Sequence, residues 1–193
     1  MLPIEFYQRP NVVEIARDLI GTYLFTQMGD DPITGGMIIE IEAYAGIEDR
    51  ASHAFGGKRT KRTEIMYHRG GIAYVYLCYG LYPLFNVVTN EINIPHAVLI
   101  RAIHPLEGIE IMHKRRKGKS PLASGPGMLC QALGITLLNN GHSLLSNSIW
   151  IEPRKIIIDD NAIEASKRIG IAYAQEDALL PWRFKYEYSL KTI

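Results

Sequence analysis

The sequence predicts a mixed α/β (α+β) fold: a single domain over residues 1–193, with a largely antiparallel curved sheet, surrounding helices and a protruding β-hairpin. Three observations lead to this prediction. A chain of 193 residues is long enough for one domain that buries a sizeable core. Several segments with period-two alternation are joined by connections too short for parallel crossovers, which favours antiparallel pairing. Repeats, flexible linkers and low-complexity tracts that would divide the chain are absent from the sequence.

The first third of the chain predicts a helix, two strands and a long loop. Asn11 is suited to cap a helix, and Glu14 stands three residues later as in a capping box, before an apolar stripe that ends near Gly21. Alternation predicts strands at 22–27 and 37–44, separated by the turn GDDPITGG. Residues 45–70 are rich in glycine and basic side chains, and predict a long loop with short helical pieces.

The rest of the chain predicts a hairpin followed by further strands and helices. Strands at 73–78 and 84–89 are joined by the tight connection YGLYP, which places aromatic residues at the hairpin tip. The remaining predicted elements are a strand at 96–103, a helix from Pro105 through about Arg116, a short helix in SGPGMLCQALG, a strand at 148–152, a helix at 160–167 and an aromatic tail, PWRFKYEY.

Positive charge is concentrated in two segments. The chain has 21 Lys and Arg against 20 Asp and Glu, a formal net charge of +1. Residues 50–69 hold six basic residues and one acidic residue, a net of +5, and residues 113–119 hold five basic residues and no acid. The remaining residues therefore carry a net charge of −9. A lone basic run usually lies on a solvated loop, but two of them beside aromatic and glycine-rich segments favour an anionic polymer as partner.

Apolar runs, the amino-terminal segment and the cysteines indicate the cellular compartment. No apolar run approaches the roughly 20 residues that span a bilayer, so we expect no membrane partner. The amino terminus has no basic start and does not resemble a signal peptide. Two cysteines, Cys78 and Cys130, in a chain able to build its own core indicate a reduced, cytoplasmic protein.

The strand sequence EIEAY places two carboxylates and a ring on one strand face. Glu40, Glu42 and Tyr44 share that face because strand side chains alternate, and repulsion between the carboxylates could raise the pKa of one of them. A general base beside a ring-binding pocket is one interpretation, and a solvated acidic face is the other. Spacing alone favours the second. The six histidines are scattered without metal-ligand spacing, so no metal site is predicted.

The hairpin sequence YVYLCYGLY also has two interpretations. Tyr74 and Tyr76 lie on one strand face, and Tyr79 precedes Gly80 at the turn. Large aromatic residues at a hairpin tip often anchor it to the core. A rigid ring at the tip could instead enter a nucleic-acid duplex and replace an extracted base in the stack. Spacing does not choose between the two.

Several blocks of sequence, taken in order, resemble the alkyladenine (3-methyladenine, methylpurine) DNA glycosylase family. They are ARDLIGTYL, IEIEAYAGIEDRASHAFGGKRTKRTEIMY, YVYLCYGLYPLFNVV, AVLIRAIHPLEGIE, SGPGMLCQALGI and PWRF. The resemblance runs from Ala16 to Phe184 and covers nearly the whole chain. It departs at Met128, where the family commonly has a lysine that contacts phosphate.

The resemblance implies a base-excision-repair enzyme that hydrolyses the N-glycosidic bond of alkylated or deaminated purines and leaves an abasic site. Glu42 matches the general base that activates water, and Arg101 matches an arginine near that water. Ile169 aligns with a residue whose backbone carbonyl contacts the water. The resemblance implies no metal and no organic cofactor. Because no lysine or terminal amine is placed to form a Schiff base, it implies a single, monofunctional glycosylase step.

The resemblance also implies how the enzyme holds its partner, double-stranded DNA containing damaged purines. Tyr79 matches the residue that intercalates at the hairpin tip. The residues that match the base pocket are Tyr44, His53, Tyr76 and Asn86. The residues expected at DNA phosphates are Arg59, Arg62 and Arg116. The family implies a compact prokaryotic, nucleoid-associated form for which a monomer suffices.

Two alternatives come from other functional classes. One is a catalytically silent damaged-DNA-binding protein, and the other is a purine nucleosidase acting on free nucleosides. Glu42 and Arg101 favour an enzyme over a silent binder, and Tyr79 with the two basic segments favours a polymer over a nucleoside. The preferred lesion (3-methyladenine, 7-methylguanine, hypoxanthine or ethenoadenine) stays open at this point.

Overall fold

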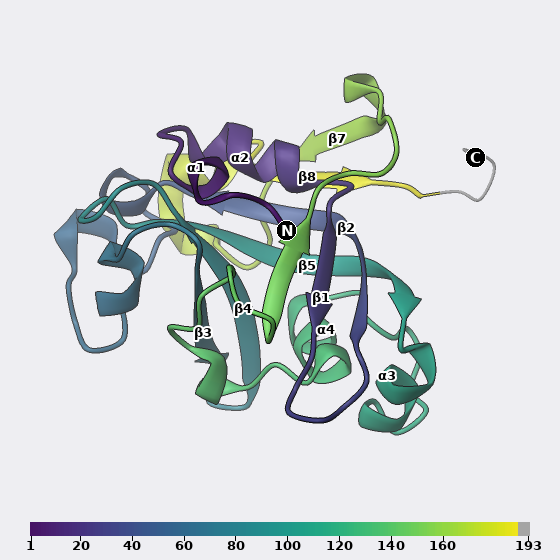
Figure 1. Cartoon of the computed structure of the whole chain (residues 1–193). Coiled ribbons are helices and arrows are strands. Elements are labelled where there is room, and N and C mark those ends of the chain that lie inside the picture. Colours follow the sequence, from purple (N-terminus) through teal and green to yellow (C-terminus); the bar gives the residue numbers. More distant parts are fainter. Residues whose placement is uncertain (189–193) are drawn as a thin grey trace.

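A computed structural model, which describes residues 1–188, shows one curled sheet flanked by helices (Figure 1). The sheet has eight strands in the order β3–β4–β5–β2–β1–β6, with β8 also paired to β2 and β7 paired to β8. The strands are β1 (Tyr23–Thr26), β2 (Thr34–Tyr44), β3 (Ile72–Cys78), β4 (Tyr82–Thr89), β5 (His96–Glu107), β6 (Ile149–Glu152), β7 (Ile163–Ser166) and β8 (Arg183–Tyr186). Their pairings are antiparallel, so the predicted mixed α/β fold with a curved antiparallel sheet is confirmed.

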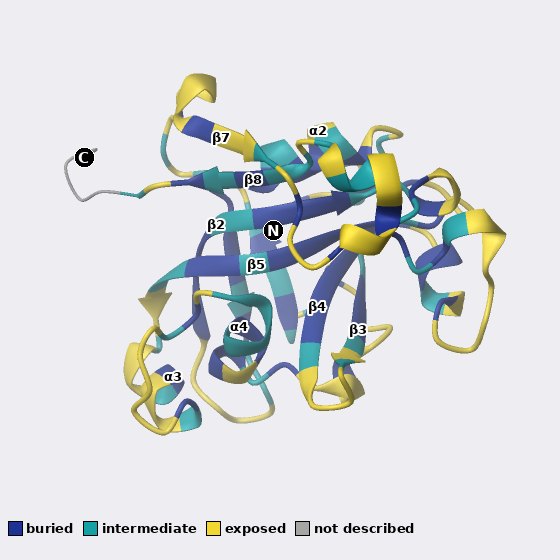
Figure 2. Cartoon of the chain, turned by 180° about the vertical axis from the view of Figure 1, so that it is seen from behind, coloured by how far each residue is buried: buried dark blue, intermediate teal, exposed yellow. Residues whose placement is uncertain are grey.

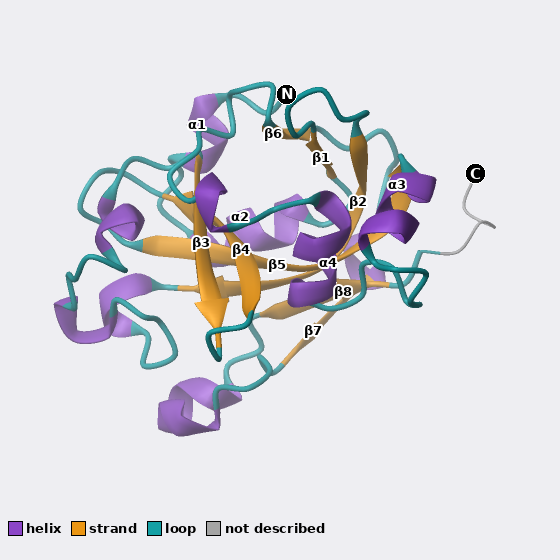
Figure 3. Cartoon of the chain, turned by 90° about the horizontal axis from the view of Figure 1, so that it is seen from below, coloured by secondary structure: helices purple, strands orange, loops and turns teal. Residues whose placement is uncertain are grey.

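The helices are short and stand around the sheet (Figure 3). The α-helices are α1 (Ile4–Tyr7), α2 (Val12–Leu19), α3 (Ile109–Arg115) and α4 (Pro126–Leu133). Single 3-10 turns or short 3-10 helices occur at Gly46–Glu48, Phe55–Gly57, Glu64–Tyr67, Leu137–Asn139, Asp160–Ala162 and Ala172–Leu179. Within residues 1–188, none of the helices has the length and apolar character needed to cross a membrane.

Strand β2 lies at the centre of the sheet and carries the predicted carboxylates. On one side it pairs with β5 along most of its length; on the other, β1 pairs with its first half and β8 with Glu40–Glu42. The register between β2 and β5 shifts three times, so that Ile39, Arg101 and Leu106 have no partner in the ladder. Such bulges bend a strand and re-aim side chains, and they are frequent beside active sites. Here the shift between Glu40 and Ile41 lets Arg101 turn toward the carboxylates of β2.

Helix α2 forms where the capping signals predict it. The Asn11 side chain accepts hydrogen bonds from the backbone N–H groups of Val13 (3.0 Å) and Glu14 (3.2 Å), and its own amide donates to the Glu14 carboxylate (2.8 Å). The apolar stripe of α2 is buried against the sheet. Each buried Leu or Ile contributes roughly 1.5–3 kcal/mol to folding, so this stripe fixes the helix on β2.

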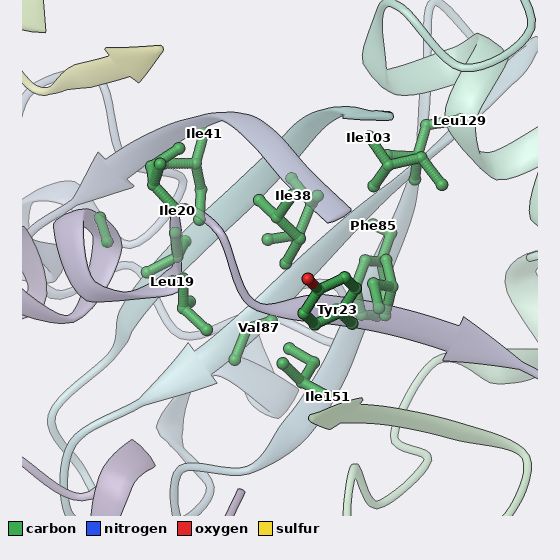
Figure 4. Close-up of a cluster of buried hydrophobic side chains, with 14 of the residues drawn as sticks. Leu19, Ile20, Tyr23, Ile38, Ile41, Phe85, Val87, Ile103, Leu129 and Ile151 are labelled. Carbon is green, nitrogen blue, oxygen red and sulfur yellow. The ribbon is translucent and has the colours of Figure 1, made fainter. Parts of the chain in front are cut away.

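The main core lies in the concave side of the curled sheet. Figure 4 shows side chains from α2, β2, β4, β5, α4 and β6 meeting there; the labelled residues include Leu19, Ile38, Phe85, Ile103, Leu129 and Ile151. Helix α4 packs against β4 and β5, and α3 packs against α4. In Figure 2 the strands are largely buried, whereas the far end of the β3–β4 hairpin is exposed. The core therefore holds the base of the hairpin and leaves its tip free.

One predicted helix begins later than expected, and another is wrong. Strand β5 continues through Pro105 to Glu107, and helix α3 begins only at Ile109. The reason lies in Gly36: a Cβ there would sit 2.1 Å from the His104 carbonyl oxygen, and this close backbone approach keeps β2 and β5 paired. Gly108, at φ +65°, then makes the break that lets α3 start.

The predicted helix at 160–167 is instead a 3-10 turn, Asp160–Ala162, followed by strand β7. It becomes a strand because the aromatic tail forms β8, whose free edge offers hydrogen bonds to β7. Two further differences are at the amino-terminal side. Helix α1 was not predicted, and β2 begins at Thr34, within the predicted turn.

Candidate active site

The predicted base-pocket residues meet around one cavity of about 410 Å³. Its walls come from β2, the loop at 45–70, the β3–β4 hairpin, β5 and the segment after Arg168. The predicted residues that line it are Tyr44, His53, Tyr76, Tyr79, Asn86 and Arg101. The volume falls within the usual range for small-molecule pockets, and rings dominate its lining. Residues distant in sequence are thus brought together as the resemblance implies.

Glu42 lies immediately behind the cavity wall. Its side chain has no exposed surface, and both of its oxygens are hydrogen-bonded. Oε1 accepts from the Ile169 backbone N–H (2.8 Å) and lies 3.2 Å from Nη1 of Arg101, and Oε2 accepts from the Tyr44 hydroxyl (2.8 Å). The three residues that contact Glu42 all line the cavity. A buried carboxylate with two hydrogen bonds and an ion pair is held in one orientation.

Glu40 serves a different purpose from Glu42. Its Oε1 accepts from Nε of Arg101 (2.7 Å) and from Nε of Arg183 (2.8 Å). Burial raises the pKa of Glu40, but the hydrogen bonds and charges of Arg183 and Arg101 outweigh it, so its pKa is lowered overall. For Glu40 the suggested rise in pKa from carboxylate repulsion is therefore wrong, because Arg101 contacts both carboxylates. The acidic face is not a solvated one.

The Tyr44 ring stands between this carboxylate and the cavity. Burial raises the pKa of Tyr44 well above its ordinary value, and the charge of Glu42 and the hydrogen bond to it raise it further. The phenol is therefore protonated at neutral pH and can donate to Glu42. Its ring also packs against the Arg168 guanidinium, whose carbon lies 4.8 Å from the ring centre.

His53 is held as a neutral imidazole. Its Nδ1 lies 2.9 Å from the Tyr74 hydroxyl, and its Nε2 lies 3.2 Å from Nη2 of Arg62. An arginine only donates, so this network assigns Nε2 as the acceptor and places the proton on Nδ1. Burial, with a contribution from the Arg62 charge, lowers the pKa of His53 to about 4. A neutral ring in this place adds no charge that would repel a cationic base.

Three rings form the aromatic wall of the cavity. The His53 and Tyr76 rings have their centres 4.6 Å apart and nearly perpendicular planes, and the Tyr74 and Tyr76 rings lie 5.4 Å apart. Burial raises the pKa of Tyr76 far above its ordinary value, so this ring is also neutral. Asn86 is buried beside them, and its Nδ2 donates to the Tyr74 carbonyl (3.2 Å), which fixes its amide at the wall.

Tyr79 lies at the rim and is 91% exposed. With Gly80 it occupies the turn between β3 and β4, and both residues have positive φ (50° and 71°). The Leu81 N–H donates to the Cys78 carbonyl (3.1 Å), as in a tight hairpin turn. A side chain with this exposure does not anchor the hairpin to the core, so that interpretation of the tip is excluded.

The three arginines expected at phosphates lie in different surroundings. Arg59 is on the surface, paired with Glu64 (2.7 Å). Arg62 is on the cavity wall, where its guanidinium carbon lies 4.8 Å above the Tyr76 ring. Arg116 is buried, and it donates to the side chain of Gln131 and to a backbone carbonyl. Arg59 and Arg62 are exposed and Arg116 is buried, and the phosphate assignments stay predictions.

Sequence reasoning missed several residues that complete the site. Tyr74 orients His53, and the Ile169 amide donates to Glu42, while the expected contact of the Ile169 carbonyl with water stays a prediction. A buried pair, Asp49 and Arg168, lies beneath them. The alternation YVY contained a signal for Tyr74. No local signal links Asp49 with Arg168, because 119 positions separate them in the chain.

Comparison with known proteins gives the family of the chain. The sequence model of the family described as "Methylpurine-DNA glycosylase (MPG)" matches residues 5–189. A relative from Chlamydia felis named "Putative 3-methyladenine DNA glycosylase" is 50% identical over 188 residues, covering 95% of each chain. A relative of the same name from Bacillus cereus is 44% identical, covering 96% of this chain and 95% of its own.

The aromatic cavity, the buried carboxylate behind it and the exposed ring at its rim thus define an enzyme site, and the comparisons give its class: a DNA glycosylase, a hydrolase of DNA repair whose substrate is DNA. The chain belongs to the methylpurine-DNA glycosylase family.

Proposed function

We propose that the protein is a monofunctional 3-methyladenine-type glycosylase that flips an alkylated or deaminated purine out of duplex DNA and hydrolyses its N-glycosidic bond. One observation carries this proposal: Glu42 is fixed by two hydrogen bonds and an ion pair directly behind a cavity lined by rings, with Tyr79 exposed at the rim. Relatives are named for 3-methyladenine, which agrees with this substrate class. Every residue of the site comes from one chain, so a monomer suffices.

The flipped base would enter the cavity and lie among the rings of Tyr44, His53 and Tyr76. Stacking and cation–π attraction to electron-rich rings favour a cationic alkylated purine by roughly 1–2 kcal/mol. The neutral state of His53 supports this preference. Flipping costs a few kcal/mol, and the cost is least for a damaged or mispaired base, so selection begins before chemistry. Tyr79 would fill the vacated place in the base stack.

Glu42 would act on a water molecule at the sugar C1′. The carboxylate takes a proton from the water, the water oxygen bonds to C1′, and the C1′–N bond breaks with its electron pair leaving on the base. A cationic purine becomes neutral as it leaves, so it needs no acid. The negative charge of Glu42 also stabilises the positive sugar of an oxocarbenium-like transition state. Arg101 orients the carboxylate from the side of Glu40.

A single glycosylase step agrees with the lining of the cavity. Among the described residues that line it there is no lysine, so no amine is placed to attack C1′ and form a Schiff base. The expected products are the free base and an unbroken strand with an abasic site.

The product distinguishes the proposal from its two alternatives. We would incubate the protein with duplex DNA carrying 3-methyladenine, hypoxanthine or ethenoadenine, and with the free nucleosides, and separate the bases by chromatography. Release from duplex DNA with little release from nucleosides is expected. Tight binding of the lesion duplex without release would identify a silent binder, and efficient release from nucleosides would identify a nucleosidase. Strand cleavage before alkali treatment would contradict the monofunctional step.

A further inference from the structure

A buried ion pair lies directly beneath the site. The side chains of Asp49 and Arg168 have no exposed surface, and Nη2 of Arg168 donates to Oδ1 of Asp49 (2.9 Å). The Asp49 carboxylate also accepts the backbone N–H groups of Ala45 (3.1 Å) and Ala51 (2.9 Å). Asp49 is therefore bound into the start of the loop that carries His53.

The guanidinium of Arg168 reaches the two residues that follow Glu42 on strand β2. Its Nη1 donates to the Ala43 carbonyl (2.8 Å), and its carbon lies 4.8 Å from the centre of the Tyr44 ring. The Trp182 ring lies 5.1 Å away, and the Asp177 carbonyl accepts from Nη2 (3.1 Å). One buried cation thus joins β2, the loop at 45–70 and the segment that leads into β8.

The residue after Arg168 makes the connection to Glu42. Ile169 donates its backbone N–H to Oε1 of Glu42 (2.8 Å). Tyr44, which packs against Arg168, donates its hydroxyl to Oε2. Both hydrogen-bond donors of Glu42 therefore depend on the position of Arg168, whereas its ion-pair partner, Arg101, is held from the opposite side by Glu40.

Stability alone is a weak reason for such a pair. Taking two charges out of water costs several kcal/mol per ion, and buried pairs often contribute little net stability compared with apolar residues of similar volume. Their geometry, in contrast, is rigid and directional. A shift of about 1 Å in a reacting group can lower the reaction rate about 100-fold. A rigid ion pair that holds the two donors of Glu42 in place would prevent such a shift.

We propose that Arg168 and Asp49 are positioning residues for the excision step, which hold the Ile169 amide and the Tyr44 hydroxyl on the Glu42 carboxylate without touching the base or DNA. This inference rests on the proposed function, in which Glu42 activates water. It predicts that loss of the pair slows the chemical step and leaves recognition of the lesion nearly unchanged.

The test uses the full chain and single-turnover excision of hypoxanthine from duplex DNA. Arg168→Met is expected to lower the excision rate about 10- to 100-fold, by analogy with the loss of a residue that orients a metal ligand. The dissociation constant for the lesion duplex should change less than about 3-fold. Because Glu42 loses a donor to its charged form, the acid limb of the pH–rate profile should move to higher pH. The other charged groups near the Glu42 carboxylate, Glu40, Arg101 and Arg183, are the same in this variant as in wild type.

Two further variants separate positioning from folding. Arg168→Lys keeps the charge but not the planar contacts, so it should lie between wild type and Arg168→Met, and it carries the test if Arg168→Met does not fold. Arg154→Met is the matched control, because Arg154 also joins distant segments, through the Arg17 and Asp18 carbonyls, away from the cavity and from both basic segments. It should lose stability and keep the excision rate and pH profile of wild type.

Wild-type rates in folded Arg168→Met or Arg168→Lys would overturn the inference. So would a loss that appears only in lesion binding, or a lower rate with an unmoved pH profile. Failure of the proposed function looks different, because the wild-type protein itself would then release no base.

Discussion

Replacing Tyr79 by glycine should stabilise the fold slightly while it damages lesion binding. Tyr79 is 91% exposed, so removing its side chain loses almost no buried surface. At φ 50° an L-residue is strained by roughly 1–2 kcal/mol, which glycine avoids. Glycine also loosens the unfolded chain, at a cost of about 0.4–1 kcal/mol. The net expectation is a gain between zero and about 1.5 kcal/mol, or a rise in Tm of a few degrees at most.

The effect on DNA should have the opposite sign. Stacking of an aromatic ring on bases contributes about 1–3 kcal/mol, so Tyr79→Gly should bind lesion duplex roughly 5- to 150-fold more weakly. Thermal melting and fluorescence anisotropy with a hypoxanthine duplex measure the two effects. Lys117→Gly, at φ 53° and away from the cavity, repeats the backbone change as a stability control. A fall in Tm of several degrees, or unchanged lesion binding, would refute the reasoning.

Three other changes test the cavity wall. Because the pKa of His53 falls to about 4 in the folded protein, the unfolded chain binds a proton on this ring more tightly. The free energy of unfolding should therefore rise between about pH 4 and 6.5, by at most about 3 kcal/mol. Thermal melting of His53→Gln should show a smaller rise over this pH range, and a rise equal to that of wild type would contradict the prediction. Arg62→Ala removes the guanidinium that covers the Tyr76 ring, so calorimetry should find that free hypoxanthine binds at least 3-fold more tightly than to wild type. The control Arg59→Ala should bind hypoxanthine with wild-type affinity. Weaker binding by Arg62→Ala would contradict the prediction. Tyr74→Phe removes the hydroxyl that orients His53, and should cost about 1 kcal/mol in a urea melt and slow single-turnover excision several-fold. An excision rate equal to wild type would show that this hydroxyl is dispensable.

The sequence predicts correctly those parts of the fold that depend on interactions between residues close together in the chain. The Asn11 cap, the apolar stripe of α2 and the alternating hairpin strands are all confirmed. The errors in the predicted helices occur where pairing between strands far apart in the sequence determines the structure. Pro105 favours the start of a helix, yet the close approach of Gly36 keeps the strand paired, and residues 163–166 become a strand only because β8 lies beside them.

The residues of the candidate site also fall into those that the sequence predicts and those that it does not. The period of two on β2 placed Glu42 and Tyr44 together, and the family resemblance supplied the roles expected of Arg101 and Asn86. The structure places these residues at one cavity, while their roles in catalysis and recognition stay predictions. Asp49 and Arg168 could not be found from spacing, because their pairing depends on how two distant loops pack beneath the sheet.

The most direct test of the account is the single-turnover excision rate of Glu42→Gln on a hypoxanthine duplex. Glutamine has nearly the same shape, and its amide oxygen can still accept from Ile169, while it cannot take a proton from water. The account predicts a rate lower by about 100- to 10,000-fold, with lesion binding retained and with Glu164→Gln, on the exposed part of β7, equal to wild type. A Glu42→Gln rate within tenfold of wild type would contradict it.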